Sequence, residues 1–220
     1  MRRRDSTAAR RKIDDRVYRP ADHWDTAYQG RATADVSWYE PTAKVSLELI
    51  ASLRLPLDAP VIDIGGGESS LASELVARGH TDVSVLDVSA VALSKVQAQL
   101  GTAVSCLRDN VLKWKPERRY ELWHDRAVLH FFTEDRDCLA YLRAVDAGVS
   151  PGGFVVLGEF GPDGPARCSG LPVRRYSPGD LRELFGDGYE LLKERNVAHI
   201  TPRGTEQQFT WVALQRRKED

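Results

Sequence analysis

The chain has 220 residues, a formal net charge of −1 and 42% hydrophobic residues. This length is enough for one compact α/β domain with a buried core, and too short for two domains of ordinary size. The nearly balanced charge argues against broad nucleic-acid binding, because phosphate contacts require a clustered basic surface. We therefore expect one domain, over residues 21–220, and no nucleic acid as partner.

The cysteine spacing and the short apolar segments indicate where in the cell the protein is located. The three cysteines have neither the paired spacing of a zinc site nor that of a disulfide framework, so we expect no metal and a reducing compartment, the cytoplasm. No apolar stretch follows the N-terminal arginines, and no segment approaches the ~20 apolar residues of a membrane span. We expect neither secretion nor membrane insertion.

The N-terminal segment has two parts of different composition. Residues 1–20 carry eight Lys or Arg residues against three Asp, which predicts a flexible basic arm, with docking to an acidic partner as the alternative. Two aromatic pairs follow, Trp24 with Tyr28, which are spaced to share one helix face, and Trp38 with Tyr39. Aromatic residues of this size belong either to the core or to a lid over a site.

The stretch VIDIGGGESS, residues 61–70, predicts a turn that binds a ligand. Four residues with strand character run into three glycines, and a helical pattern follows at once. Glycine lets the backbone take positive φ and pass close to a ligand. The helix presents free N–H groups in its first turn, with Ser69 and Ser70 as candidate caps.

Two carboxylates narrow the class of ligand. Asp87 ends the next apolar run, residues 83–86, at the distance where nucleotide-binding folds place an acceptor for ribose hydroxyls. Asp63 lies two residues before the first glycine, where it repels a pyrophosphate and attracts a cofactor that carries an ammonium and a sulfonium. The pattern therefore predicts a cofactor that contains a nucleoside and carries positive charge.

The rest of the chain alternates helical and strand patterns. We expect helices over residues 41–53, 89–100, 138–149 and 177–185, and strands over residues 103–107, 120–124, 153–160, 189–197 and 206–215. This order predicts a doubly wound α/β sheet, in which ligands bind outside the carboxyl ends of the strands where the strand order reverses. The first and fourth strands flank that point, and the fourth brings Asp125, Arg126 and His130 to it. A core histidine is the alternative for His130.

An inserted segment, GPDGPARCSGLPVRRY at residues 161–176, is too long and too rich in Gly and Pro for a simple connection. Long irregular insertions at a ligand-facing edge are often binding loops. We interpret it as a cap that offers Arg167, Arg174 and Tyr176 to a substrate, with a plain surface loop as the alternative.

These motifs carry a resemblance to a known family. The runs VIDIGGGESSLASEL and DVSVLDVSAVALSKVQAQL resemble the class I S-adenosylmethionine-dependent methyltransferases, and the resemblance extends from about Ala21 to Gln215. Through HWDTAY, SWYE and GGGESSL the chain is similar to the branch that contains protein-lysine methyltransferases and small bacterial methyltransferases of undefined substrate. The resemblance implies a seven-stranded Rossmann-like sheet, mostly parallel, with one antiparallel strand in a C-terminal hairpin. It also implies that residues 21–54 form a lid.

The resemblance assigns roles at the site. S-adenosylmethionine is the implied cofactor, and either Asp109 or Asn110 accepts from its adenine amino group. The implied cofactor-binding residues are Trp24, Tyr28, Trp38, Asp63, Gly65, Gly66, Gly67, Ser69, Ser70, Asp87, Val88, Asp109, Asn110, Val111, Asp125 and Arg126. Candidate bases for an amine acceptor are Asp125, His130, Glu159 and Tyr39. Candidate substrate contacts are Trp38, Tyr39, Glu159, Arg167, Arg174 and Tyr176.

Three questions stay open at this point. The acceptor is either a protein lysine or a small metabolite, and the oligomeric state is undetermined. The rival enzyme class is an NAD-dependent oxidoreductase, because Gly65, Gly67 and Ser70 come close to the GxGxxG pattern, although Asp63 argues against it. The rival without catalysis is a cofactor-binding scaffold that recruits a partner through its basic arm.

Overall fold

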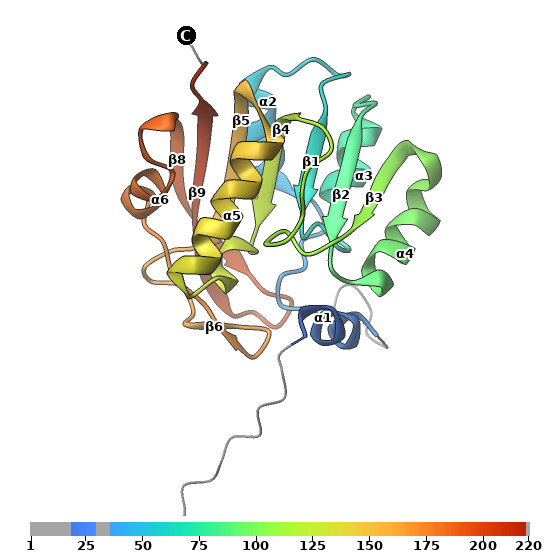
Figure 1. The fold of residues 1–220 in the computed structure, drawn as a ribbon. Helices are drawn as coiled ribbons and strands as arrows, with labels where there is room; N and C mark the ends of the chain where they lie inside the picture. Colours follow the sequence, from blue (N-terminus) through green and yellow to red (C-terminus); the bar gives the residue numbers. More distant parts are fainter. Residues whose placement is uncertain (1–18, 30–35, 219–220) are drawn as a thin grey trace, which may run out of the picture.

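The computed structural model describes residues 19–29 and 36–218 (Figure 1). The predicted basic arm therefore lies almost wholly outside the described residues. Across the described part, the chain forms an α/β fold with one large sheet and a two-stranded hairpin.

The large sheet has seven strands in the order β3-β2-β1-β4-β5-β9-β8. They are β1 Val61–Ile64, β2 Val83–Asp87, β3 Val104–Arg108, β4 Tyr120–Arg126, β5 Val149–Phe160, β8 Tyr189–Ile200 and β9 Glu206–Arg216. The pairs among β1 to β5 are parallel, whereas β9 runs antiparallel to both of its neighbours. The predicted Rossmann-like sheet with one antiparallel strand is confirmed, and its strand order reverses between β1 and β4.

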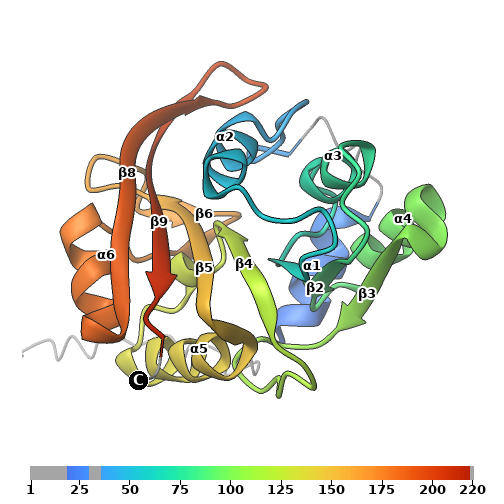
Figure 2. The ribbon, with the colours of Figure 1, turned by 90° about the horizontal axis from the view of Figure 1, so that it is seen from above.

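Helices cover both faces of this sheet, as the view from above shows (Figure 2). The helices are α1 Pro20–Tyr28, α2 Lys44–Leu53, α3 Leu71–Ala77, α4 Ala90–Leu100, α5 Asp135–Gly148 and α6 Pro178–Phe185. The apolar cores show that α2, α3 and α4 pack on one face and α5 and α6 on the other. Helix α1 lies instead beyond the carboxyl ends of β1 and β2 (Figure 1).

The central strands are buried because both faces are covered. All four residues of β1 and all five of β2 are buried, which matches their nearly continuous apolar sequence. Two of these buried residues, Asp63 and Asp87, are acidic and stand toward the carboxyl ends of their strands. Because carboxylates are rarely buried, their presence at this edge of the sheet indicates a candidate functional site.

Several predicted boundaries differ from the structure: α2 begins at Lys44 rather than at residue 41, β4 ends at Arg126 rather than at residue 124, and β8 ends at Ile200 rather than at residue 197. Strand β5 begins at Val149 rather than at residue 153, because Val149 already pairs with Tyr120 and a register shift between Tyr120 and Leu122 absorbs the Gly-rich turn. Helix α5 begins at Asp135, three residues before the predicted start at residue 138. Within the inserted segment, residues 161–176, two short strands β6 Arg167–Cys168 and β7 Leu171–Pro172 pair as a hairpin.

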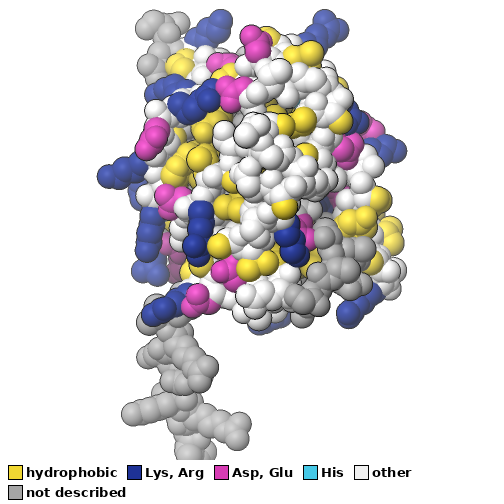
Figure 3. Space-filling model, turned by 90° about the vertical axis from the view of Figure 1, so that its right-hand side faces the viewer, with side chains coloured by type: hydrophobic (Ala, Val, Ile, Leu, Met, Phe, Trp, Pro, Cys, Tyr) yellow, Lys and Arg dark blue, Asp and Glu magenta, His cyan; other side chains and the backbone are white. Residues whose placement is uncertain are grey.

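The surface is mixed in charge where the described side chains can be seen. On the face shown in Figure 3, Lys and Arg side chains are interspersed with Asp and Glu. Among the described helices, none combines the length and the apolar character that crossing a membrane requires.

Gly158 on β5 provides a test of the sheet packing. It lies directly opposite Trp211 on β9, and a Cβ at this position would stand 2.6 Å from the Trp211 ring. Because Trp211 is buried and cannot retreat, we expect Gly158→Ala to lower the free energy of unfolding by about 1–3 kcal/mol. Gly188→Ala is the matched control, because a Cβ there meets nothing within 4 Å. Equal urea midpoints for the two variants would contradict this packing.

Candidate functional site

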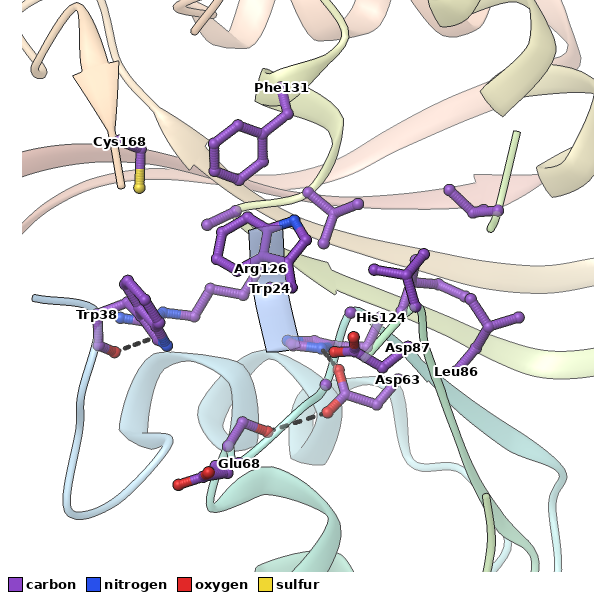
Figure 4. A pocket seen from close by; sticks show the side chains of 18 of the residues that line it. Trp24, Trp38, Asp63, Glu68, Leu86, Asp87, His124, Arg126, Phe131 and Cys168 are labelled. Carbon is purple, nitrogen blue, oxygen red and sulfur yellow. Dashed lines mark hydrogen bonds and ion pairs between the residues drawn. The ribbon is translucent and has the colours of Figure 1, made fainter. Parts of the chain in front are cut away.

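A cavity of about 550 Å³ opens at the carboxyl ends of β1, β2 and β4, next to the point where the strand order reverses (Figure 4). Acidic residues gather on one side of it and aromatic residues on the other. The predicted residues that line it are Trp24, Tyr28, Trp38, Tyr39, Asp63, Gly65, Gly66, Ser69, Ser70, Asp87, Val88, Asp109, Asn110, Val111 and Arg126. The structure thus brings together most of the residues predicted to bind the cofactor.

The glycine turn is too closely packed for side chains. Gly65 and Gly67 have φ values of 60° and 45°, in the left-handed region that favours glycine. A Cβ on Gly65 would lie 2.2 Å from a methyl carbon of Val128, and one on Gly67 would lie 2.5 Å from the Tyr28 hydroxyl. Gly67 does not itself line the cavity, because the Tyr28 side chain covers it. The turn therefore requires glycine so that Tyr28 of α1 and Val128, which follows β4, can approach it.

Asp63 is held by hydrogen bonds on both of its oxygens. Its Oδ1 lies 2.7 Å from His124 Nδ1, and its Oδ2 accepts a hydrogen bond of 3.0 Å from the Ser69 hydroxyl. Asp63 and His124 are register partners on the neighbouring strands β1 and β4. His124 Nε2 lies in turn 2.9 Å from the hydroxyl of Ser46 on α2. This chain of contacts fixes the orientation of Asp63 beside the glycine turn.

Asp87 is the most perturbed carboxyl group of the cavity lining. Its Oδ1 accepts a hydrogen bond of 2.8 Å from the Ser89 backbone N–H. Burial raises the pKa of Asp87 to about 7, and the nearby carboxylate of Asp63 adds to this rise. A buried carboxyl group that ionises near neutral pH is suited to accept hydrogen bonds from a ligand that replaces the missing solvation.

The two residues after β3, Asp109 and Asn110, differ in the hydrogen bonds that their side-chain oxygens accept. Asn110 Oδ1 accepts the Leu112 N–H at 3.0 Å, so this oxygen stabilises the turn that follows. Asp109 Oδ1 accepts the Asn110 N–H at 2.7 Å, and Asp109 is otherwise exposed at the cavity rim. Asp109 Oδ2 is therefore better placed than Asn110 Oδ1 to accept a hydrogen bond from a ligand.

Four aromatic rings form the opposite wall of the cavity. Trp24 is at their centre, with ring centroids 5.7 Å from Trp38, 5.2 Å from Phe131 and 6.4 Å from Tyr28. Burial raises the pKa of Tyr28 well above its ordinary value, and the carboxylates of Asp87 and Glu68 add to it. The Tyr28 phenol therefore stays protonated. The wall offers apolar surface and ring faces rather than ionisable groups.

Helix α1 is fastened across the cavity by polar contacts to α4. Asp25 accepts hydrogen bonds from the Ser89 hydroxyl at 2.6 Å and from the Val91 N–H at 3.2 Å. Lys95 donates to the Tyr28 carbonyl oxygen at 3.2 Å and pairs with Glu68 of the cavity lining. These contacts hold the aromatic wall in place over the glycine turn.

The segment from Val36 to Glu40 is fastened on the other side of the cavity. Arg126, at the end of β4, donates to the Trp38 carbonyl oxygen at 2.8 Å, and its Nη2 atom lies 3.1 Å from Glu40 Oε1. His199 of β8 lies 3.3 Å from the same Glu40 oxygen and 2.8 Å from the Ser37 carbonyl oxygen. Burial alone would raise the pKa of Glu40, but His199 and Arg126 outweigh it and lower the pKa.

Besides Gly67, six predicted residues do not line the cavity. Asp125 points to the opposite face of β4 from His124 and Arg126, because successive strand residues alternate. There it accepts from the Tyr141 hydroxyl at 2.6 Å and from the Val128 and Leu129 N–H groups. The others that do not line the cavity are His130, Glu159, Arg167, Arg174 and Tyr176.

Asp125, His130 and Glu159 instead form one fully buried cluster. Burial raises the pKa of Asp125 to about 6 and that of Glu159 well above its ordinary value, the latter with help from Asp125. Burial and nearby Arg126 lower the pKa of His130 to about 3. A neutral histidine beside a protonated carboxyl group is compatible with a packed interior. Catalytic roles for Asp125 and His130 remain predictions.

Sequence reasoning missed several residues of the lining, among them Ser46, His124, Phe131 and Cys168. For His124 a signal was present, because a strand that directs Arg126 toward a site directs the residue two positions earlier the same way. For Ser46 no local signal exists, since its contact with His124 joins residues far apart in the sequence.

Comparison with known proteins agrees with this geometry. Residues 61–153 match a family model described as a methyltransferase domain. A SAM-dependent methyltransferase from Anabaena variabilis is 16% identical, with a TM-score of 0.71, and the match covers 91% of this chain and 96% of that one. At such identity the likeness shows the fold.

Two further solved structures share the fold. The Burkholderia thailandensis 1,6-didemethyltoxoflavin-N1-methyltransferase, with bound 1,6-didemethyltoxoflavin and S-adenosylhomocysteine, is 18% identical with a TM-score of 0.67 and 94% of each chain covered. The DhpI protein, in complex with SAM and HEP, is 18% identical with a TM-score of 0.65, over 90% of this chain and 97% of that one.

The raised pKa of Asp87 predicts a pH-dependent stability. The unfolded chain ionises Asp87 near its ordinary pKa of 3.8 and the folded chain only at about 7, so stability is lost as the pH rises between these values. At about pH 8 we expect Asp87→Asn to raise the free energy of unfolding of the ligand-free protein by about 1–4 kcal/mol. The gain shrinks toward about pH 4. Urea unfolding across this range measures it, and a gain independent of pH would contradict the assignment.

Proposed function

We propose that this chain is a class I S-adenosylmethionine-dependent methyltransferase and that it methylates a small molecule with an apolar body. The match of residues 61–153 to a methyltransferase-domain model and the Rossmann-like sheet support the first part of the proposal. The observation that carries the proposal is the division of one cavity into an acidic side and an aromatic side. The branch with protein-lysine methyltransferases is not distinguished from others by the family match.

The acidic side suits the cofactor. Asp63, Glu68, Asp87 and Asp109 line it, and S-adenosylmethionine presents a sulfonium and an ammonium. Four carboxylates, of which Asp63 and Asp87 are buried, favour such a ligand over a dinucleotide, whose pyrophosphate they would repel. The closely packed glycine turn supplies backbone in place of side chains next to them, so the residues present fit the group.

Individual roles follow from the contacts. We assign Asp87 to the ribose hydroxyls, because its carboxyl group is buried and lines the cavity at the end of β2. We assign Asp109 rather than Asn110 to the adenine amino group, because Asn110 Oδ1 is occupied by the Leu112 N–H. Asp63 supplies negative charge near the ammonium group, with its side chain fixed by His124 and Ser69. S-adenosylmethionine supplies the methyl group.

The aromatic side suits the acceptor. Trp24, Trp38, Tyr39 and Phe131 line it together with Cys168 of the hairpin β6–β7. We propose that residues 21–54 act as the lid and residues 161–176 as the cap, because both segments contribute to the lining. Cavities of several hundred Å³ with apolar walls and few polar groups are typical of sites for small organic molecules. The small acceptor bound in the Burkholderia enzyme accords with this proposal.

The chain's own contribution to transfer is alignment. Holding two reactants in line can supply ~7–11 kcal/mol of the barrier. Tyr39 is the predicted base that lines the cavity, whereas Asp125 and His130 are buried behind it. We therefore propose that an acceptor amine binds unprotonated or that the acceptor atom needs no base.

The acceptor class is tested with cofactor that carries a radiolabelled methyl group. The protein is incubated with this cofactor and a cell extract, which is then separated into macromolecular and small-molecule fractions. We expect the label in the small-molecule fraction. Label on protein would overturn the small-molecule proposal, and bound cofactor with no transfer in either fraction would favour the scaffold alternative.

The role of Asp87 is tested by binding of S-adenosylhomocysteine. Loss of hydrogen bonds to a charged group predicts that Asp87→Asn weakens binding about 10–100-fold. In the unsubstituted protein, affinity falls up to about tenfold between about pH 8 and about pH 6, because Asp87 takes up a proton near pH 7.

The matched control is Asp82→Asn, near the start of β2, where Asp82 pairs with Arg118 away from the cavity. Its calorimetric titration should resemble that of the unsubstituted protein. NADH serves as the competing ligand. Binding of NADH in place of S-adenosylhomocysteine would overturn the cofactor assignment.

A further inference from the structure

Arg126 is the one arginine among the described residues that line the cavity. Its guanidinium leans away from the acidic side, over the ring of Phe209 on β9, with 5.4 Å from Cζ to the ring centroid. It is close enough to Cys168 of the cap to act on that thiol electrostatically. The group therefore belongs to the β4–β5–β9 side of the cavity, whereas Asp87 ends β2 and Asp109 follows β3 on the other side.

The guanidinium of Arg126 uses only part of its hydrogen-bonding capacity. Nη1 donates to the Trp38 carbonyl oxygen, but Nε and Nη2 are buried and have no hydrogen-bond acceptor among the described residues. The side chain is only 12% exposed. Buried donors on a charged group without acceptors are rare and costly, and in a site they indicate a missing oxygen ligand.

The two donors that lack a hydrogen-bond acceptor, Nε and Nη2, lie on the same edge of the guanidinium. Nε–H and Nη2–H point in parallel, and their spacing matches the two oxygens of a carboxylate. Glu40 does not fulfil this role, because its Oε1 lies 3.1 Å from Nη2 without hydrogen-bond geometry and also lies 3.3 Å from His199. Glu40 balances the charge of Arg126 and leaves its two-donor edge unused.

We infer that the methyl acceptor carries a carboxylate, which the Nε–Nη2 edge of Arg126 binds while the aromatic wall contacts its apolar body. This inference rests on the proposed function and names the substrate class of the same site. Binding requires a small shift of Glu40, since the two donors are covered in the ligand-free protein. Arg126 is thereby a specificity-determining residue rather than a contact of the cofactor.

The test uses benzoate, with benzamide as a neutral probe of the same shape, in the presence of saturating S-adenosylhomocysteine. Ligand-observed NMR measures the affinity of each probe. We expect benzoate to bind about tenfold more tightly than benzamide, because two charge-assisted hydrogen bonds replace neutral ones. In Arg126→Gln this preference disappears. Equal binding of the two probes, or no benzoate binding at millimolar concentration, would overturn the inference.

Two more variants separate recognition from a structural role of the Arg126–Glu40 pair. Glu40→Gln removes the carboxylate that competes with benzoate, so it should strengthen benzoate binding about threefold or more and leave benzamide unchanged. If Arg126 served only to fasten the Trp38 segment, Glu40→Gln would weaken both probes alike. Arg182→Gln, on the exposed surface of α6, is the matched control and should change neither.

The same titrations distinguish failure of this inference from failure of the proposed function. Affinity for S-adenosylhomocysteine is measured in each variant by calorimetry. If it falls more than about tenfold in Arg126→Gln, then Arg126 binds the carboxylate of the cofactor and the inference is wrong while the methyltransferase assignment stands. If the unsubstituted protein does not bind S-adenosylhomocysteine, the proposed function itself fails.

Discussion

The contact between Asp63 and His124 ties the site to the fold. It crosses the boundary between β1 and β4, which is where the strand order reverses and where an open sheet leaves a crevice. Through Ser69 it reaches the glycine turn, and through Ser46 it reaches α2. This network of buried hydrogen bonds thus determines the orientation of Asp63, the shape of the glycine turn and the position of α2. Displacement of one of these three parts would therefore alter the other two.

The buried carboxylates on the acidic side of the cavity lower the stability of the ligand-free protein. Asp63 and Asp87 are both buried, and the carboxylate of Asp63 adds to the rise in the pKa of Asp87 that burial causes. Such repulsion has no structural benefit in the ligand-free protein. It becomes favourable when a cation lies between the carboxylates, because the same charges that repel one another then attract the ligand in a medium of low dielectric constant. Binding energy and ligand-free strain therefore have the same physical origin.

The local parts of the fold were predictable from the sequence, and its long-range contacts were not. Val61–Ile64, the glycines and Asp87 carry strong short-range signals, and the structure places them as predicted. The predicted start of β5 at residue 153 was wrong, because Val149 already pairs with Tyr120 and a register shift accommodates the Pro-Gly-Gly turn that follows. Sequence spacing reports turn chemistry well, but whether a turn interrupts a sheet depends on the partner strand.

The choice between Asp125 and its two neighbours shows the same limit at the site. All three residues end β4, and the sequence does not state which face the cavity occupies. Alternation then divides them: His124 and Arg126 reach the cavity, and Asp125 turns to Tyr141 on α5. A one-residue difference in strand register would exchange the two sets. The chemistry available at this strand end, an acid or a base with an arginine, is therefore decided by pleat and register rather than by composition.

The pairing of Arg126 with Glu40 also has a consequence for the ligand-free state. An unpaired guanidinium beside half-buried Trp38 and buried Phe209 would carry a large desolvation penalty, and Glu40 together with the Trp38 carbonyl oxygen reduces it. Because Glu40 is shared with His199, it can shift toward that partner without losing its compensation. The network can thus release one edge of the guanidinium and remain neutralised. Because Glu40 contacts His199 as well as Arg126, this ion pair is better suited to exchange partners than an isolated salt bridge.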